Sequence, residues 1–94
     1  MIRSVLVTDG EQRAALATVR SLGRAGYRVC VCSPRRRSVA GASRYAGFET
    51  RTPDPLADPG GFVESVAELV RRLRIDVVLP ITEASLRALL PERD

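Results

Sequence analysis

Four short apolar runs, separated by two amphipathic segments, dominate the hydrophobic pattern along the chain. Ser4–Thr8 and Tyr27–Cys32 are nearly continuous in apolar residues, Gly47–Arg51 is weaker, and Ile75–Leu79 ends at Pro80. Continuous apolar runs of this length are typical of strands buried on both faces of a parallel sheet. We therefore predict four strands, with Gly47–Arg51 at an edge of the sheet.

The segments between these runs repeat their apolar residues with helical spacing. Between Gln12 and Ala25 the apolar residues form one stripe and the arginines lie on another face, and Gly26 is expected to end the helix. Asp58-Pro59 is expected to begin a second helix, as an N-cap followed by proline. Thr82 is expected to cap a third, which runs to Leu90. The buried stripe of the second helix is predicted to be Phe62, Val66, Leu69, Val70 and Leu73.

Alternation of strands and helices predicts an α/β fold with right-handed crossovers. The simplest solution is an open, Rossmann-like parallel sheet of about four strands in the order 3-2-1-4, with helices on both faces. Residues 1–94 then form a single domain. No strand follows to cover Leu86, Leu89 and Leu90. We therefore expect this domain to be the N-terminal part of a longer protein.

The charged residues restrict the chemistry that the chain can perform. Its net charge of +4 comes from 15 arginines, because Lys and His are both absent. An imidazole base, a Schiff-base lysine and a phosphate-binding P-loop lysine are therefore excluded, and we predict no catalytic residue and no metal site. Cys30 and Cys32 alternate within a strand, so we expect both to be buried and reduced on one face.

The same composition bears on location and partners. No apolar run is long enough to cross a membrane, and no charged-then-apolar leader begins the chain, so we expect a cytoplasmic protein without membrane contact. The arginines are spread through every segment with few aromatic residues between them. This distribution argues against nucleic-acid binding.

Ligands of open parallel sheets bind beyond the carboxyl ends of the strands, where the strand order reverses. Here that position lies between the first and fourth strands. The candidate substrate-binding residues are Asp9, Gly10 and Glu11 on one side and Thr82 and Glu83 on the other. Their carboxylates suit an ammonium or a metal-bound group and repel a pyrophosphate. The alternative is structural: Asp9 and Thr82 cap helices, while Glu11 and Glu83 complement helix dipoles.

Arg35, Arg36 and Arg37 follow the second strand, where NADP-binding folds often place arginine. However, Glu11, Gln12 and Arg13 stand where a dinucleotide fingerprint requires glycines. We therefore reject a dinucleotide site. The three arginines remain candidates for binding an anionic ligand or partner, and the alternative is a solvated surface.

Three stretches in order resemble a known family: "VLVTDGEQRAALATVRSLGRAGYRVCVCS", "SRYAGFETRTPDP" and "IDVVLPITEASL". Together they are similar to the N-terminal, pre-ATP-grasp domain of ATP-grasp ligases, in the carbamoyl-phosphate-synthase-like and carboxylate–amine ligase branch. The resemblance extends from Val5 to about Leu90.

This resemblance implies a domain on the substrate side of a ligase, inactive on its own. Its partners would be the C-terminal ATP-grasp domains of the same protein and a small carboxylate or amine substrate. The resemblance implies ATP and magnesium for the parent ligase, held by those later domains, and no cofactor in this chain. The alternative is a small regulatory module that binds an anion through Arg35–Arg37. We also expect that its exposed surface can support self-association.

Overall fold

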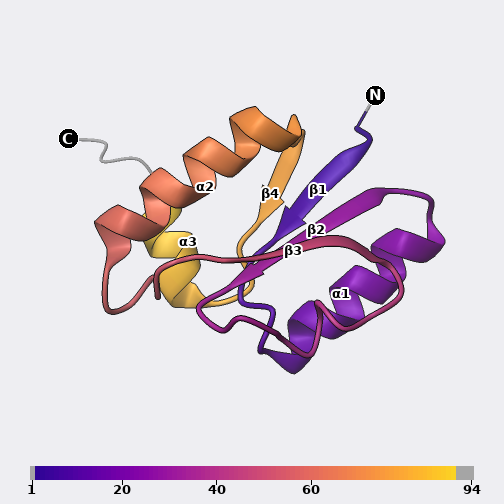
Figure 1. Cartoon of the computed structure of the whole chain (residues 1–94), viewed down its shortest axis with the longest axis horizontal. Coiled ribbons are helices and arrows are strands. Elements are labelled where there is room, and N and C mark those ends of the chain that lie inside the picture. Colours follow the sequence, from indigo (N-terminus) through magenta and orange to yellow (C-terminus); the bar gives the residue numbers. More distant parts are fainter. Residues whose placement is uncertain (1, 91–94) are drawn as a thin grey trace.

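The computed structural model describes residues 2–90 and has a four-stranded parallel sheet at its centre (Figure 1). The strands lie in the order β3-β2-β1-β4, and every neighbouring pair is parallel. The predicted α/β class and strand order are therefore confirmed. The strands are β1 (Ser4–Val7), β2 (Arg28–Ser33), β3 (Ala46–Arg51) and β4 (Val77–Leu79).

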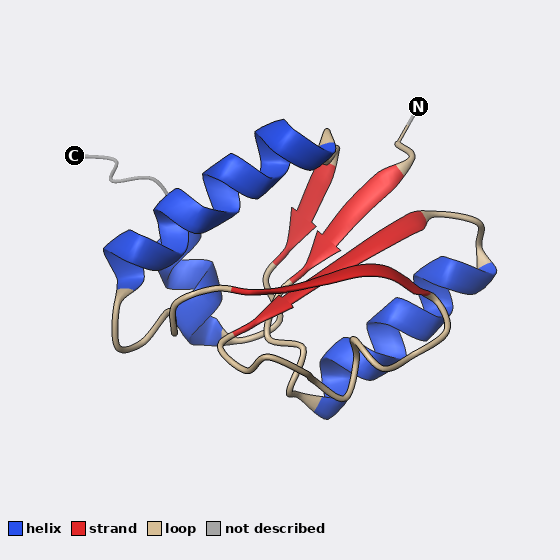
Figure 2. Cartoon of the chain, in the orientation of Figure 1, coloured by secondary structure: helices blue, strands red, loops and turns tan. Residues whose placement is uncertain are grey.

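Three helices cover the two faces of this sheet (Figure 2): α1 (Arg13–Arg24), α2 (Pro59–Leu73) and α3 (Glu83–Leu89). Helix α1 packs on one face through Ala15 and Val19, which lie in the same core cluster as alternate residues of β1 and β2. Helix α2 packs on the other face with part of α3. The apolar residues that α2 buries or half-buries include Val63 together with all those predicted: Phe62, Val66, Leu69, Val70 and Leu73.

Local sequence signals account for the helix ends. Gly26 adopts a φ of 94°, and the Tyr27 amide donates to the Leu22 carbonyl, which is the Schellman arrangement that ends α1. Arg74 ends α2 in the left-handed region with a φ of 55°. The Asp58 side chain accepts a 3.0 Å hydrogen bond from the Gly61 amide at the start of α2, as expected for an N-cap.

Cys30 and Cys32 confirm the prediction made for them. Both are fully buried, both face the α2 side of the sheet, and neither forms a disulfide. Like the other apolar residues of β1 and β2, these side chains are removed from water, and this burial of apolar surface is the main force that stabilises a parallel sheet covered on both faces.

The connection between β2 and β3 is irregular and passes alongside α1 (Figure 1). It contains one helical turn, in which the Ala42 amide donates to the Ser38 carbonyl at 3.0 Å. Ala40 is fully buried against the α1 side of the sheet. This loop is therefore packed into the core rather than lying free in solvent.

The β4 side of the molecule is less covered than its centre. Val77, Val78 and Leu79 are each only partly buried, and Leu86 and Leu90 are exposed. Residues 91–94, which follow α3 in the chain, lie outside the described residues. No helix among residues 2–90 is both long enough and apolar enough to cross a membrane.

Candidate binding site at the carboxyl ends of the strands

Asp9 connects the end of β1 to the start of α3. Its Oδ2 accepts hydrogen bonds from the amides of Ile81 (3.3 Å) and Thr82 (3.2 Å) and from the Ser85 hydroxyl (2.7 Å). Its Oδ1 accepts from the Thr82 hydroxyl at 3.2 Å, and the neighbouring Thr8 hydroxyl also donates to the carboxylate. Asp9 is only 4% exposed, so its bonding capacity is used within the protein.

This arrangement requires unusual backbone geometry at Asp9. Its φ of 57° lies in the left-handed region, which costs about 1–2 kcal/mol for an L-residue and is best tolerated by Asn and Asp. The Asp9 carboxylate bonds to the start of α3 and not to α1, the helix that follows it in the chain. The N-cap of α1 is Gln12, which makes no side-chain cap. Asp9 therefore stabilises the N-terminus of α3, as in the capping alternative but at a different helix.

Gly10 is enclosed by protein atoms rather than open to a ligand. A Cβ at this position would overlap the side chains of Ser38 and Val31. Its amide donates to the Cys32 carbonyl (3.1 Å), and its own carbonyl accepts from the Ala40 amide (2.9 Å). The single glycine of the first turn is thus required by the packing of the β2–β3 loop, and it has no free amide for a phosphate.

Glu49 on β3 holds the same loop in place. Its carboxylate accepts hydrogen bonds from the Ser38 amide (2.7 Å) and the Ser38 hydroxyl (2.8 Å). That hydroxyl also accepts from the Gly41 amide at 2.9 Å. Sequence reasoning missed this pair because Ser38 lies in an apparently polar loop. The available signal was a glutamate inside the third apolar run.

Thr82 and Glu83 have different environments although they are adjacent. Thr82 is the N-cap of α3, as predicted, and accepts from the Ser85 amide at 3.2 Å. The Glu83 side chain is 75% exposed and pairs with Arg87 across one turn at 2.9 Å. The geometry therefore gives Glu83 a solvated ion pair on the helix surface, and its contact with a substrate stays a prediction.

The two walls of the predicted crevice bond directly to each other. The Thr8 amide donates to the Leu79 carbonyl at 3.2 Å, and the Ile81 amide donates to the Thr8 hydroxyl at 3.1 Å. Together with the bonds to Asp9, these contacts join the end of β1 to the end of β4. Asp9, Gly10 and Thr82 are brought together here, but as a brace rather than as an open pocket.

Glu11 is the member of the predicted set that is left with unused bonding capacity. The side chain is partly buried, and its Oε1 is shielded from solvent without a hydrogen-bond partner among residues 2–90. The carboxylate lies within electrostatic reach of Cys32, at the end of β2 on the α2 side. Glu11 therefore lies near the carboxyl end of β2.

Cys32 and Thr52 lie beside this carboxylate. Burial raises the pKa of the Cys32 thiol to about 12, the adjacent Thr52 hydroxyl lowers it, and the negative charges of Asp9 and Glu11 raise it further. The thiol is therefore protonated at neutral pH and is not a nucleophile. Thr52 is 4% exposed, and its hydroxyl oxygen has no conventional hydrogen-bond partner in the described part of the chain.

Arg35, Arg36 and Arg37 are all exposed at the start of the β2–β3 loop. The Ser33 hydroxyl accepts from the Arg35 amide (2.9 Å) and donates to the Arg35 carbonyl (3.0 Å), which fixes the first of them. Within residues 2–90, none of the three forms an ion pair. They lie near the carboxyl edge but outside the Asp9 brace.

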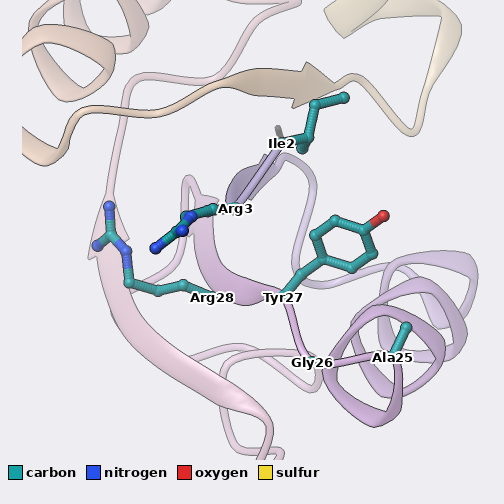
Figure 3. A pocket seen from close by; sticks show the side chains of 6 residues that line it. All are labelled: Ile2, Arg3, Ala25, Gly26, Tyr27 and Arg28. Atoms are coloured by element: carbon teal, nitrogen blue, oxygen red, sulfur yellow. The ribbon is translucent and has the colours of Figure 1, made fainter.

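A broad surface hollow lies at the opposite, amino-terminal edge of the sheet (Figure 3). It is lined by Ile2, Arg3, Ala25, Gly26, Tyr27 and Arg28. The Arg28 guanidinium donates to the Leu73 carbonyl and therefore serves the end of α2. Because parallel sheets bind ligands at their carboxyl ends, this hollow is not the predicted crevice.

No model of a known protein family matches the sequence, and no curated protein is significantly similar to it.

Proposed function

We propose that this chain is the substrate-holding domain of an ATP-dependent ligase of the ATP-grasp kind, in the carboxylate–amine or carbamoyl-phosphate-synthase-like branch. The observation that supports this most directly is the unpartnered oxygen of Glu11 at the carboxyl ends of the strands. A carboxylate that has lost part of its hydration attracts an ammonium group more strongly than it would in open water. Glu11 is therefore the residue that we assign to the amine substrate.

The ATP-dependent step belongs, in this proposal, to the ATP-grasp domains of the same cytoplasmic protein. The residues of this chain do not fit ATP, because the Gly10 amide is already bonded to Cys32 and lysine is absent from the sequence. The 94-residue chain alone is therefore expected to release no ADP from magnesium and ATP, with or without substrates.

A ligand panel tests the role of Glu11. Thermal stability of the 94-residue chain would be measured with each of the common amino acids and with their N-acetyl derivatives, which lack the ammonium group. We expect at least one amino acid to stabilise the protein and its N-acetyl derivative to have no effect. Glu11→Gln should weaken this binding by roughly ten- to a hundredfold, since a charge-assisted hydrogen bond is worth about 1.5–3 kcal/mol.

Glu64→Gln is the matched control, because Glu64 is an exposed carboxylate on α2 and the charge change is the same. Equal weakening by both substitutions would indicate diffuse electrostatics and remove Glu11 from the site. Sequencing of the coding region beyond the Asp94 codon tests the domain organisation separately. We expect an ATP-grasp domain in the same reading frame, and a stop codon there would contradict the ligase proposal.

A second candidate function is anion binding by Arg35, Arg36 and Arg37, which are exposed and without ion pairs in the described residues. Such a module would bind an acidic ligand or partner without ATP chemistry. Replacement of all three by Gln should then abolish binding of that acidic ligand, whereas binding of an amino acid at Glu11 should survive the replacement.

A further inference from the structure

A second hollow lies against the end of α1, where the loop from β2 turns into β3. It is separate from the Asp9 brace and from the hollow of Figure 3. Its volume is about 450 Å³, which falls within the range of small-molecule sites. The residues that line it are Arg20, Arg24, Ala42, Ser43, Arg44 and Tyr45.

The wall formed by Tyr45 is held firmly by packing. The ring lies directly on Gly23, where a Cβ would overlap side-chain atoms of Tyr45. The Tyr45 amide donates to the Ser43 hydroxyl at 3.1 Å, and the Ala46 amide donates to the Ser43 carbonyl at 3.0 Å. Since the Ser43 hydroxyl oxygen accepts the bond from the Tyr45 amide, the hydroxyl proton is available to donate to a ligand.

Tyr45 is in direct contact with one arginine of the hollow. Arg44 donates to it at 3.1 Å and also lies over the ring, with its guanidinium carbon 5.0 Å from the ring centre. The pKa of Tyr45 is lowered, chiefly by this hydrogen bond; desolvation opposes the shift, and Arg44 and Arg24 add smaller lowering contributions. Arg24 lines the same hollow as Tyr45.

Among residues 2–90, no carboxylate lines this hollow to balance the three arginines. Within residues 2–90 the ion pair formed by Arg87 and Glu83 is the only one, and it lies on α3. Like charges that share a site repel one another, and a bound anion removes that repulsion. Guanidinium groups also match the oxygen geometry of phosphate through paired N–H donors.

We propose that the hollow formed by Arg20, Arg24, Ser43, Arg44 and Tyr45 binds the phosphate group of a small phosphate monoester. Three cationic side chains and one hydroxyl donor suit a tetrahedral dianion, and the volume leaves room for an organic part beside the phosphate. The arginines surround one hollow, which favours a compact ligand over a polynucleotide. This site does not depend on the proposed ligase role, because it lies on the α1 side, away from Glu11.

The probes are inorganic phosphate, glycerol phosphate and sulfate, titrated into ¹⁵N-labelled protein at constant ionic strength. We expect saturable shifts centred on the amides of residues 42–45, with glycerol phosphate binding at least as tightly as phosphate. Arg24→Gln and Arg44→Gln should each weaken binding by about tenfold or more, the usual effect of losing one charged hydrogen bond. Arg71→Gln is the matched control, because Arg71 is also exposed in the last turn of a helix.

The proposal predicts a change of less than about twofold for Arg71→Gln, as expected for a distant surface charge in salt. Equal weakening by Arg71→Gln and Arg24→Gln would overturn it, since net charge alone would then explain the binding. Absence of saturable shifts with all three probes would overturn it as well. Lowered stability of Arg24→Gln with unchanged phosphate affinity would show that Arg24 serves only the end of α1, and would also refute the site.

Discussion

Removal of the Asp9 carboxylate is the most direct test of how this domain is held together. Asp9→Ala leaves the amide of Thr82 and the hydroxyl of Ser85 without this acceptor, whereas the Ile81 amide keeps its bond to the Thr8 hydroxyl. Each buried donor left without a partner costs about 1–3 kcal/mol. Alanine in the left-handed region also costs about 1–2 kcal/mol, whereas aspartate and asparagine tolerate this conformation better.

We therefore expect Asp9→Ala to lower the free energy of unfolding by about 3–5 kcal/mol, allowing for hydration of the freed donors. The total stability of a domain of this length is about 5–14 kcal/mol, so the variant should lose a large share of its stability. Asp9→Asn keeps the shape, tolerates the same φ and retains one acceptor oxygen. Its amide can donate to the Thr82 hydroxyl, so a loss of only about 1–2 kcal/mol is expected.

Urea denaturation followed by circular dichroism at fixed pH measures both losses. Glu83→Gln is the control, because it also removes a carboxylate from this end of the molecule but an exposed one. If Asp9→Ala were as stable as wild type, the bonds to α3 would contribute nothing and the bracing role of Asp9 would be refuted. Equal losses for Asp9→Ala and Asp9→Asn would show that charge, and not donor satisfaction, dominates.

Three further outcomes follow from the geometry. Gly23→Ala should destabilise the chain by about 1–2 kcal/mol despite the better helix propensity of alanine, because the added methyl group displaces the Tyr45 ring. Gly60→Ala is the comparison, because a Cβ at this position meets no other atom. In the same denaturation assay it should stabilise the chain by about 0.5–1 kcal/mol. The pKa of the Cys32 thiol is raised to about 12 in the native state, so as pH rises above about 9 this thiol ionises first in the unfolded chain. The free energy of unfolding should therefore fall above this pH by about 1.4 kcal/mol per pH unit. Cys32→Ser should remove that part of the slope, and an identical slope in both proteins would contradict it. Glu83→Gln should leave the melting temperature within about 2 °C of wild type, since its ion pair is solvated, and a larger loss in calorimetry would mean that Glu83 has further contacts.

The predicted elements agree closely with the observed ones because their signals are local. Each of these signals depends on residues within a few positions of one another: the end of α1 at Gly26, the N-caps Asp58 and Thr82, and the buried stripe of α2. Strand order also follows from the alternation of strands and helices, because right-handed crossovers leave few arrangements. Neighbouring residues are therefore enough to predict the helix ends and the buried stripe, and the order of elements is enough to predict the strand order.

The candidate site was less predictable because its contacts join distant parts of the chain. Asp9 and Ser85 are 76 residues apart, and Ser38 and Glu49 are 11 apart across an irregular loop. Sequence reasoning placed Asp9 correctly at the carboxyl edge, but it could not tell whether the carboxylate would face a ligand or α3. That depended on the left-handed backbone at Asp9, for which a single sequence carries no clear signal.

The sequence alone thus determined the α/β class, the parallel sheet, the burial of both cysteines and the chemistry excluded by the absence of lysine and histidine. Only the tertiary structure decided which polar groups are already satisfied: Asp9 and Gly10 are engaged, while Glu11 retains an oxygen without a partner among residues 2–90. The physical reason is that burial of apolar residues follows from periodicity along the chain. Satisfaction of a buried polar group depends instead on the exact position of partners that folding brings from elsewhere.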